Sequence, residues 1–375
     1  MPVPHQDRIG GLTFLAFFLF PLYSLGFVVL GRVLPFLFPQ VSPSSAKVKR
    51  ISRDIKGKNV IVTGANSGVG SGITKELLRR GANVTMACRS ATRAEKARSE
   101  FISELSAQGF ASDDLEKRLT VAQLDTSSLA SVREFGKAVV ASGRKVDLLY
   151  LNAGIGGATP DGNVLTSDGF EVIYQTNFLG HFLLVNLLEP ILAEDARIVS
   201  TSSFGALLAL SWKDFSTSSV VGKADPGFHF SESAVFSEAT SRTMSGYSYS
   251  KAMQIIFTRA LNDRALATGS QRKAFAFHPG LVSSNFFTLT RQLNKLDFVR
   301  LVGSLESVLG VTPEESAQTP VLFGLLTDEG LGPRSRWSKV YERGIAFTTP
   351  QEYLDPDRFW VRWSADAGID ADWAV

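Results

Sequence analysis

Short apolar runs alternate with longer amphipathic stretches along most of this chain. Segments of ten or more residues with helical spacing separate the apolar runs. Short apolar runs of this kind are typical of strands buried in a parallel sheet, and strands that alternate with helices indicate that helices cover both faces. The pattern therefore predicts one doubly wound α/β domain. Its expected strands are Asn59–Thr63, Asn83–Cys88, Leu119–Leu124, Asp147–Leu151, Arg197–Thr201 and Ala274–His278.

The beginning of the chain has a different pattern. Residues 10–31 are 22 residues without a charge, and a second apolar run, 33–38, follows Arg32. A helix rising about 1.5 Å per residue over such a run spans a hydrocarbon core of roughly 30 Å. Lys47, Lys49, Arg50 and Arg53 follow, and positive charge beside a span favours the cytoplasmic side. Residues 10–38 are therefore predicted to anchor the chain in membrane lipid.

Three other interpretations compete for this segment. The apolar run is longer than the roughly 7–15 residues of a cleaved signal peptide. A buried core helix would show a polar face, which is missing here. A re-entrant hairpin bent at Pro21 is the third alternative. We favour membrane anchorage, with a single span preferred to a hairpin.

Composition limits the function classes. The chain has 375 residues, of which 44% are hydrophobic, and its net charge is +3. This apolar content excludes disorder, and so small a charge is no nucleic-acid signature. Cys88, the single cysteine, allows no intrachain disulfide, and the scattered histidines predict no metal site. The expected organisation is an anchor and basic linker (1–55), a catalytic domain (56–345) and an acidic tail containing tryptophan (346–375).

A glycine-rich turn joins the first predicted strand to a helix. Glycines let a backbone approach a pyrophosphate, and the helix N-terminus supplies N–H donors. Any strand-to-helix turn can use glycine, but strand, turn and helix stand here in the order that a Rossmann-type dinucleotide site requires. The predicted cofactor contacts in this turn are Thr63, Gly64, Asn66, Ser67, Gly68, Val69 and Gly70.

The end of the second strand bears on the choice of cofactor. Dinucleotide folds often place an acidic residue there to bind the ribose hydroxyls. No Asp or Glu lies between Gly81 and Ala94, whereas Arg89 and Arg93 do. A guanidinium suits a 2′-phosphate, so the sequence favours NADP(H) over NAD(H). The alternative is that both arginines are solvated residues at a helix start.

Seven motifs in order resemble those of the short-chain dehydrogenase/reductase family, over roughly Lys56 to Tyr341. They are the Thr-Gly-x-x-x-Gly-x-Gly turn from Thr63, Asp125 after the third strand, Asn152-Ala153-Gly154, Asn177, the strand ending in Ser202-Ser203, Tyr247-x-x-x-Lys251 and the loop His278–Ser284. The stretches Asn-Phe-Leu-Gly-His-Phe and Ala-Cys-Arg-Ser look most like the membrane-bound retinol-dehydrogenase and WW-domain-oxidoreductase-like branch. No WW pattern precedes the fold.

The resemblance implies roles for these residues. The implied catalytic group is Asn177, Ser203, Tyr247 and Lys251, with Ser203 preferred to its neighbour Ser202. Asn177 would position a water molecule that links Lys251 to solvent. The further implied cofactor contacts are Asp125, Asn152, Ala153, Gly154, Tyr247, Lys251, Pro279, Gly280, Val282 and Ser284, the last standing where many relatives have Thr.

Tyr247 and Lys251 are four residues apart and share one face of a helix. A phenol with a pKa near 10 is a poor acid or base at neutral pH, and a nearby ammonium favours the phenolate. Lys251 is therefore expected to lower the pKa of Tyr247. Tyr247 would then exchange a proton with a carbonyl or alcohol, and Ser203 would hydrogen-bond the same oxygen.

Three segments depart from or extend the compact pattern. Forty-three residues, 204–246, separate Ser203 from Tyr247. This insert would either cover an apolar substrate cleft or form a solvated excursion. Thr312-Pro313-Glu314-Glu315 predicts a helix start, with a capping residue, a proline and a glutamate in their preferred positions. The acidic tail shows no catalytic signal.

The resulting expectation is an NADP(H)-dependent oxidoreductase for a lipophilic alcohol or carbonyl, of retinoid, sterol or fatty type. It would lie on the endoplasmic reticulum with its catalytic domain facing the cytosol, bind no nucleic acid and possess the surface for a homodimer. A light-driven pigment reductase, a non-catalytic NADP-binding scaffold and a sugar-nucleotide epimerase are the alternatives. The glycine spacing disfavours the epimerase, and the presence of Tyr247 and Lys251 disfavours the scaffold.

Overall fold

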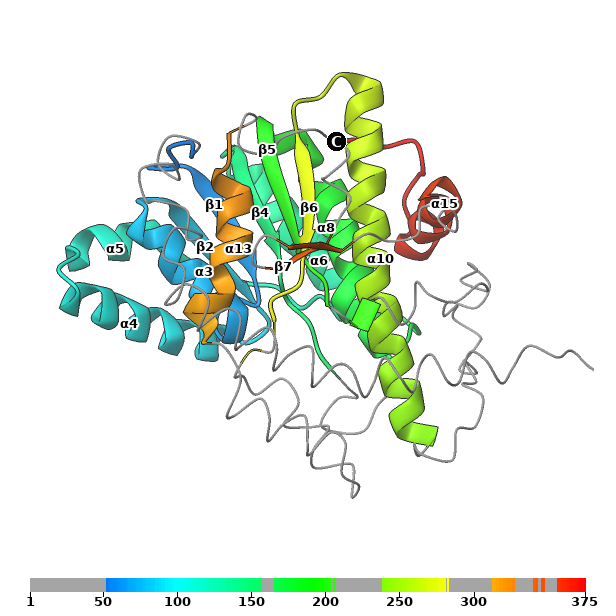
Figure 1. Ribbon diagram of the computed structural model, residues 1–375, viewed down its shortest axis with the longest axis horizontal. Coiled ribbons are helices and arrows are strands. Elements are labelled where there is room, and N and C mark those ends of the chain that lie inside the picture. Colours follow the sequence, from blue (N-terminus) through cyan, green and yellow to red (C-terminus); the bar gives the residue numbers. More distant parts are fainter. Residues whose placement is uncertain are drawn as a thin grey trace, which may run out of the picture.

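Eight strands form one sheet in the order β3-β2-β1-β4-β5-β6-β7-β8 (Figure 1). Neighbouring strands from β3 to β7 run parallel, and β8 runs antiparallel to β7. This arrangement confirms the predicted doubly wound sheet. The strands are β1 (Asn59–Thr63), β2 (Asn83–Cys88), β3 (Leu119–Gln123), β4 (Val146–Leu151), β5 (Leu192–Thr201), β6 (Lys273–Phe277), β7 (Val340–Glu342) and β8 (Ile345–Phe347).

The computed structural model describes residues 52–156, 165–203, 205–206, 238–280, 282, 312–327, 340–342, 345–347 and 356–375. The predicted anchor at 10–38, the larger part of the 204–246 insert, and Ser284 lie outside these residues. Within the described ranges, none of the helices combines the length and the apolar character needed to cross a membrane.

Strand positions agree with the pattern of apolar runs to about one residue at most ends. The main difference is β5, which begins at Leu192, five residues before the predicted Arg197. Glu194 and Asp195 in the early part of this strand are exposed and interrupt the apolar pattern, and the pairing with β4 is irregular between Val146 and Leu148. The short strands β7 and β8 were not predicted, because three residues carry too little periodicity to be recognised.

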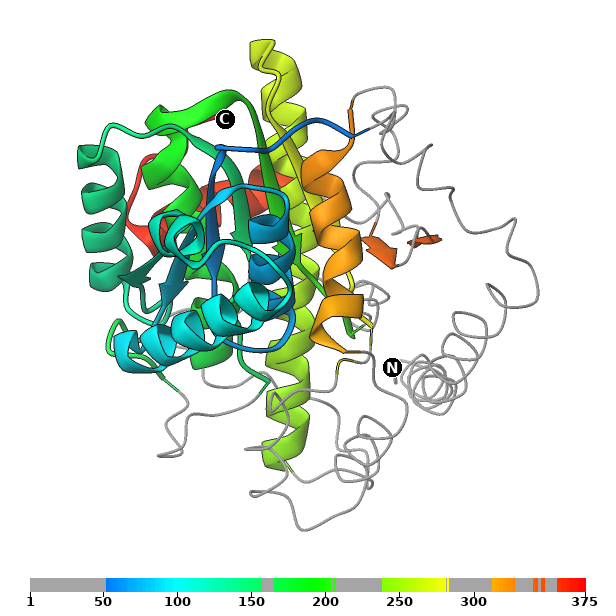
Figure 2. The same ribbon diagram turned by 90° about the vertical axis from the view of Figure 1, so that its left-hand side faces the viewer.

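Helices cover both faces of the sheet. One face carries α3 (Gly68–Arg79), α4 (Ala91–Ala107), α5 (Ser112–Arg118) and α13 (Pro313–Leu325), which face the viewer in Figure 2. The other face carries α6 (Leu129–Ala141), α7 (Val172–Tyr174), the π-helical turn η2 (Gln175–Leu179), α8 (Gly180–Leu188), the 3₁₀ turn η3 (Glu189–Ile191) and α10 (Glu238–Thr268). A last helix, α15 (Pro356–Ala367), packs outside α8 and α10 (Figure 1).

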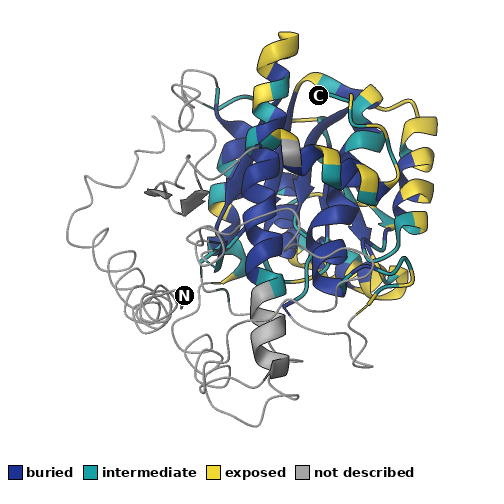
Figure 3. Cartoon of the chain, turned by 90° about the vertical axis from the view of Figure 1, so that its right-hand side faces the viewer, coloured by how far each residue is buried: buried dark blue, intermediate teal, exposed yellow. Residues whose placement is uncertain are grey.

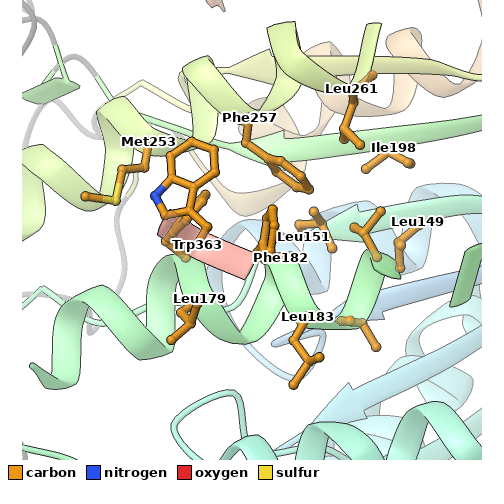
Figure 4. Close-up of a cluster of buried hydrophobic side chains, with 14 of the residues drawn as sticks. Leu149, Leu151, Leu179, Phe182, Leu183, Ile198, Met253, Phe257, Leu261 and Trp363 are labelled. Carbon is orange, nitrogen blue, oxygen red and sulfur yellow. The ribbon is translucent and has the colours of Figure 1, made fainter. Parts of the chain in front are cut away.

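Two apolar clusters fill the space between the sheet and its helices. The cluster around α3, α4 and α13 includes Ile73 and Val321. The cluster around α8, α10 and α15 includes Phe182, Phe257 and Trp363, whose rings converge in Figure 4. The central strands β4 and β6 are buried at every residue, as expected for strands covered on both faces, and the interior of the domain is dark blue in Figure 3.

The helix start predicted at Thr312 is confirmed. The Thr312 hydroxyl accepts a hydrogen bond from the Glu315 backbone N–H at 3.1 Å, and the Glu315 carboxylate accepts one from the Thr312 backbone N–H at 2.8 Å. This capping box begins α13 beside α3. The two helices approach so closely at Gly72 that a Cβ there would lie 2.1 Å from the Pro313 carbonyl oxygen.

Candidate active site

The carboxyl ends of β1, β4 and β5 meet at one edge of the sheet. Thr63 ends β1, Asn152 follows β4, and Thr201 ends β5. The Asn152 side chain donates to the Thr63 carbonyl oxygen at 3.0 Å, and the Thr201 hydroxyl donates to the Asn152 side-chain oxygen at 3.3 Å. Ligands of doubly wound folds bind at this edge, so these residues mark the candidate site.

The glycine turn fits a dinucleotide. Gly64 has a φ of 65°, and a Cβ on it would lie 2.9 Å from the Ala153 Cα. A Cβ on Gly70 would lie 2.3 Å from the Gly64 carbonyl oxygen, so the turn can fold this tightly only with glycine. The side chain of Ser67 does not cap α3, and the first turn of α3 contains no acidic residue. Its N–H groups are therefore suited to bind the phosphate oxygens of a cofactor.

The end of β2 presents two guanidinium groups. Arg89 follows the strand, Arg93 lies in the first turn of α4, and both are exposed. Asp125, after β3, accepts hydrogen bonds through Oδ1 from the Ser127 N–H at 2.9 Å and the Ser127 hydroxyl at 2.6 Å. These bonds hold the Asp125 carboxylate in a tight turn at the same edge of the sheet.

Tyr247, Ser203 and Lys251 lie together. The hydroxyl of Tyr247, on α10, is hydrogen-bonded to Ser203 just beyond β5. Ser203 Oγ also accepts from the Gly205 N–H at 3.2 Å. Lys251 Nζ lies 5.6 Å from the centre of the Tyr247 ring and donates to the Thr201 carbonyl oxygen at 2.8 Å. Three predicted catalytic side chains are thus within reach of one reacting group.

Burial dominates the pKa values of this pair. It raises the pKa of Tyr247 to about 12, against an opposing effect of the Ser203 hydrogen bond. It lowers the pKa of Lys251 to about 7. The expected lowering of the tyrosine pKa is therefore not what this structure shows, because burial destabilises the Tyr247 phenolate more than the Ser203 hydrogen bond stabilises it. Lys251 instead becomes a group that can bind or release a proton near neutral pH.

The two adjacent serines have different surroundings. The Ser202 hydroxyl is buried and donates to the Lys251 carbonyl oxygen at 2.7 Å, while its N–H donates to the Phe277 carbonyl oxygen at 2.8 Å. Ser202 therefore joins β5 to α10 and β6. Ser203 is the serine whose side chain reaches Tyr247.

Asn177 lies in the π-helical turn η2 and is fully buried. Its Oδ1 accepts from the Ile155 N–H at 2.7 Å, and its Nδ2 donates to the Ile155 carbonyl oxygen at 3.0 Å and to Ser250 Oγ at 3.1 Å. The side chain thus connects the segment after β4 to the residue beside Lys251. A π-helical turn is frequently found at functional sites, and here it orients this asparagine.

The predicted loop after β6 is described only in part. Pro279 and Gly280 follow the strand, with Gly280 at a φ of 83°, and Val282 is described as well. Among the described residues, no three His, Cys, Asp or Glu side chains are grouped as a metal ion would require.

Sequence reasoning missed two side chains and one helix that contribute to the site. Gln254 and His181 both contact the Asn177 carbonyl oxygen, at 2.7 Å from Nε2 and 3.0 Å from Nδ1. Gln254 continues the helix face of Tyr247 and Lys251 at helical spacing, and His181 is four residues after Asn177, so spacing alone could have indicated both. The helix is α15, whose Trp363 ring lies 4.5 Å from that of Phe178, next to Asn177.

A doubly wound sheet with this glycine turn defines a dinucleotide-binding protein of the Rossmann type. The sequence profile described as short chain dehydrogenase matches residues 58–218. Mouse retinol dehydrogenase 14 is 35% identical over 74% of this chain and 77% of its own length. Mouse retinol dehydrogenase 11 is 34% identical over 93% of this chain and 99% of its own length. The chain belongs to the short-chain dehydrogenase/reductase family, in the retinol-dehydrogenase-like branch.

Solved structures show the same fold. The crystal structure of an uncharacterized protein from Mycobacterium paratuberculosis is 26% identical, has a TM-score of 0.57 and covers 87% of this chain and 98% of its own. The Pseudomonas aeruginosa RhlG/NADP active-site complex is 22% identical, with a TM-score of 0.50, and covers 74% of this chain and 92% of its own.

Proposed function

We propose that this chain is an NADP(H)-dependent oxidoreductase that interconverts a lipophilic alcohol and its carbonyl compound, of the retinoid type. The observation that carries the proposal is the group of Tyr247, Ser203 and Lys251 beside the glycine turn. The names of the relatives, retinol dehydrogenases 11 and 14, support the substrate class.

When bound, the nicotinamide supplies or accepts the hydride. The chain supplies the proton. Tyr247 donates its hydroxyl proton to the carbonyl oxygen during reduction, and in its phenolate form it takes a proton from the alcohol during oxidation. Ser203, hydrogen-bonded to Tyr247, binds the same oxygen and stabilises its developing negative charge. Lys251, whose pKa is lowered to about 7 by burial, returns a proton from its ammonium form to the Tyr247 phenolate that reduction leaves behind.

The residues of this chain favour the phosphorylated cofactor. The glycine turn and the N-terminus of α3 would bind the pyrophosphate, and Asp125 would lie against the adenine. Arg89 and Arg93 are exposed where the 2′ position of the adenosine ribose is expected. A guanidinium binds a phosphate through two parallel hydrogen bonds, which a ribose hydroxyl cannot accept equally well.

Membrane attachment is the third part of the proposal. The uncharged residues 10–31 and the basic residues that follow support an anchor on the endoplasmic reticulum with the catalytic domain in the cytosol. Retinoids partition into bilayers, so an anchored enzyme would meet its substrate there.

The test is an NADPH oxidation assay on the full chain in detergent, with all-trans-retinal, a ketosteroid and a long-chain aldehyde as substrates. We expect turnover of at least one of them, and retinal to be preferred. The variant Y247F should lose about 10²–10⁴-fold in kcat, since general acid–base catalysis contributes that much, while it still binds NADPH. Full activity in Y247F would disprove the mechanism.

A further inference from the structure

His181, at the start of α8, lies between the two halves of the candidate site. It is 1% exposed, and it joins the side chain of Thr63 to the backbone of Asn177, two residues that are completely buried. Its Nε2 lies 2.9 Å from Thr63 Oγ1, and its Nδ1 lies 3.0 Å from the Asn177 carbonyl oxygen. The imidazole therefore connects the end of β1, where the glycine turn begins, to the turn that holds Asn177.

The partners of the ring determine where its proton lies. A carbonyl oxygen can only accept a hydrogen bond, so Nδ1 must carry a hydrogen to bind the Asn177 oxygen. Thr63 Oγ1 accepts from the N–H groups of Asn152 at 2.8 Å and Ala153 at 2.9 Å, which occupies both of its lone pairs. Its own hydrogen must then be donated, and His181 Nε2 at 2.9 Å is nearer than the Tyr150 carbonyl oxygen at 3.3 Å.

A neutral ring is the one form that satisfies every partner. An imidazolium would add a third donor to Thr63 Oγ1, which has no lone pair left for it. Burial and the nearby Lys251 charge lower the pKa of His181 to about 4, which agrees with a neutral ring at physiological pH. The Asn177 carbonyl oxygen is in turn saturated, because Gln254 Nε2 donates to it at 2.7 Å.

We infer that His181 is a positioning residue, held in the neutral form with its proton on Nδ1, that couples the glycine turn to the turn carrying Asn177. On one side, the ring holds the Thr63 hydroxyl in place. That hydroxyl in turn holds the backbone N–H groups of Asn152 and Ala153, against which the cofactor would bind. The other side maintains Asn177, whose side chain contacts the neighbour of Lys251. The contribution of this coupling to turnover rests on the proposed function.

The proton position is tested by nitrogen NMR of the full chain labelled with ¹⁵N-histidine. The chain has four histidines, and the signal lost in the variant H181N identifies His181. We expect a protonated Nδ1, an unprotonated Nε2 and no titration of this ring above about pH 5, given its pKa of about 4. A proton on Nε2, or titration near the ordinary pKa, would overturn the inference.

Two half-variants test the coupling. H181N retains a side-chain donor near the Nδ1 position, which can still bind the Asn177 carbonyl oxygen. H181Q retains a side-chain acceptor near the Nε2 position, which can still bind the Thr63 hydroxyl. H181N should keep kcat within about threefold and weaken NADPH binding about tenfold, and H181Q should do the reverse, because each loses one buried hydrogen bond. The Tm of each variant is measured as well. A merely structural role of His181 would lower Tm in both variants and leave kcat and NADPH affinity unchanged.

The outcomes separate the two proposals. Equal losses of kcat and NADPH affinity in both variants, or no loss in either, would overturn the role of His181. If the wild-type chain oxidises NADPH with none of the three carbonyl compounds, the proposed function fails. The proton position and the NADPH affinities of the two variants would then still decide whether His181 holds the two segments.

Discussion

Lys251 shows how burial sets the chemistry of one side chain. Its Nζ donates to the Thr201 carbonyl oxygen, and within the described residues no carboxylate forms an ion pair with it. Loss of solvent destabilises the ammonium, and the pKa of Lys251 falls to about 7. The same burial that costs stability gives the site a group that exchanges protons at neutral pH.

This cost predicts a pH-dependent gain in the variant K251M, measured without cofactor. Below pH 7 the lysine is charged in both folded and unfolded chains, so the full penalty applies. Between about pH 7 and 10.5 the unfolded chain binds more protons, and the wild-type free energy of unfolding rises with pH. At about 1.4 kcal/mol per pKa unit, a fall from 10.5 to about 7 corresponds to roughly 5 kcal/mol, so K251M should gain up to that amount at pH 6.5 and much less at pH 10.

Urea unfolding at the two pH values checks this prediction. The control is K96M, because the Lys96 side chain is 79% exposed and its substitution should change stability little at either pH. An equal gain for K251M at both pH values would show that the Lys251 charge carries no such penalty.

Arg89 carries the prediction on cofactor choice. The variant R89A should weaken NADPH binding by roughly tenfold to a hundredfold, because it loses a charge-assisted hydrogen bond to the 2′-phosphate. NADH binding should stay within about twofold. Quenching of protein fluorescence measures both affinities, and R144A, at an exposed position before β4, is the control. A parallel loss for both nucleotides would refute the assignment of Arg89 to the phosphate.

At the scale of elements, α15 packs against the outer side of the turn that carries Asn177. Trp360 and Trp363 are almost fully buried, and the Trp363 ring lies 4.5 Å from Phe178 and 5.7 Å from Phe182. The Tyr174 hydroxyl donates to Asp366 at 2.9 Å. A segment without a catalytic signal in its sequence therefore packs against the helices that carry Asn177 and Lys251.

Removing one of these rings should test that support. W363A should lower the free energy of unfolding by about 3–5 kcal/mol, because a large buried aromatic side chain leaves a cavity. V361A on the same helix is the control, since Val361 is 60% exposed, and it should change stability by less than about 0.5 kcal/mol. Chemical unfolding curves give both values. Similar losses in the two variants would show that the aromatic packing does not hold this helix in place.

At the scale of the whole molecule, apolar residues serve two separate purposes. In the described residues they fill the two clusters between sheet and helices. The uncharged residues 10–31 precede this fold. A helix on the surface of a soluble domain has one apolar and one polar face, and these residues lack the polar face. The proposed anchor would therefore add a membrane attachment to a domain whose described residues already form two apolar clusters.

The corresponding prediction concerns fractionation of cells that express the full chain. The wild type should remain with membranes after alkaline extraction, whereas the double variant L19R/L25R should be released, because each arginine in a bilayer costs about 2.5–3.5 kcal/mol. The double variant Q40R/S44R, with the same added charge beyond the apolar run, should stay with membranes. Retention of all three proteins would argue against a span at 10–31.

Much of this protein could be predicted from local patterns. The strands from β1 to β6, the glycine turn, the capping box at Thr312 and the edge of the sheet that carries the site follow from residue types at short spacings. Such features depend on neighbours in the chain, which the sequence displays directly. The 247–251 spacing also places Tyr247 and Lys251 on one helix face.

Only the tertiary structure decided the rest, because it depends on which distant segments become neighbours. The packing of α15 against Phe178, the different environments of Ser202 and Ser203, and the contact of His181 with Thr63, 118 residues away, are long-range. Desolvation likewise depends on the complete surroundings of a side chain, so the lowered pKa of Lys251 and the raised pKa of Tyr247 were not visible in the pattern. The sequence by itself determined which groups could react, and the fold decided their protonation and their partners.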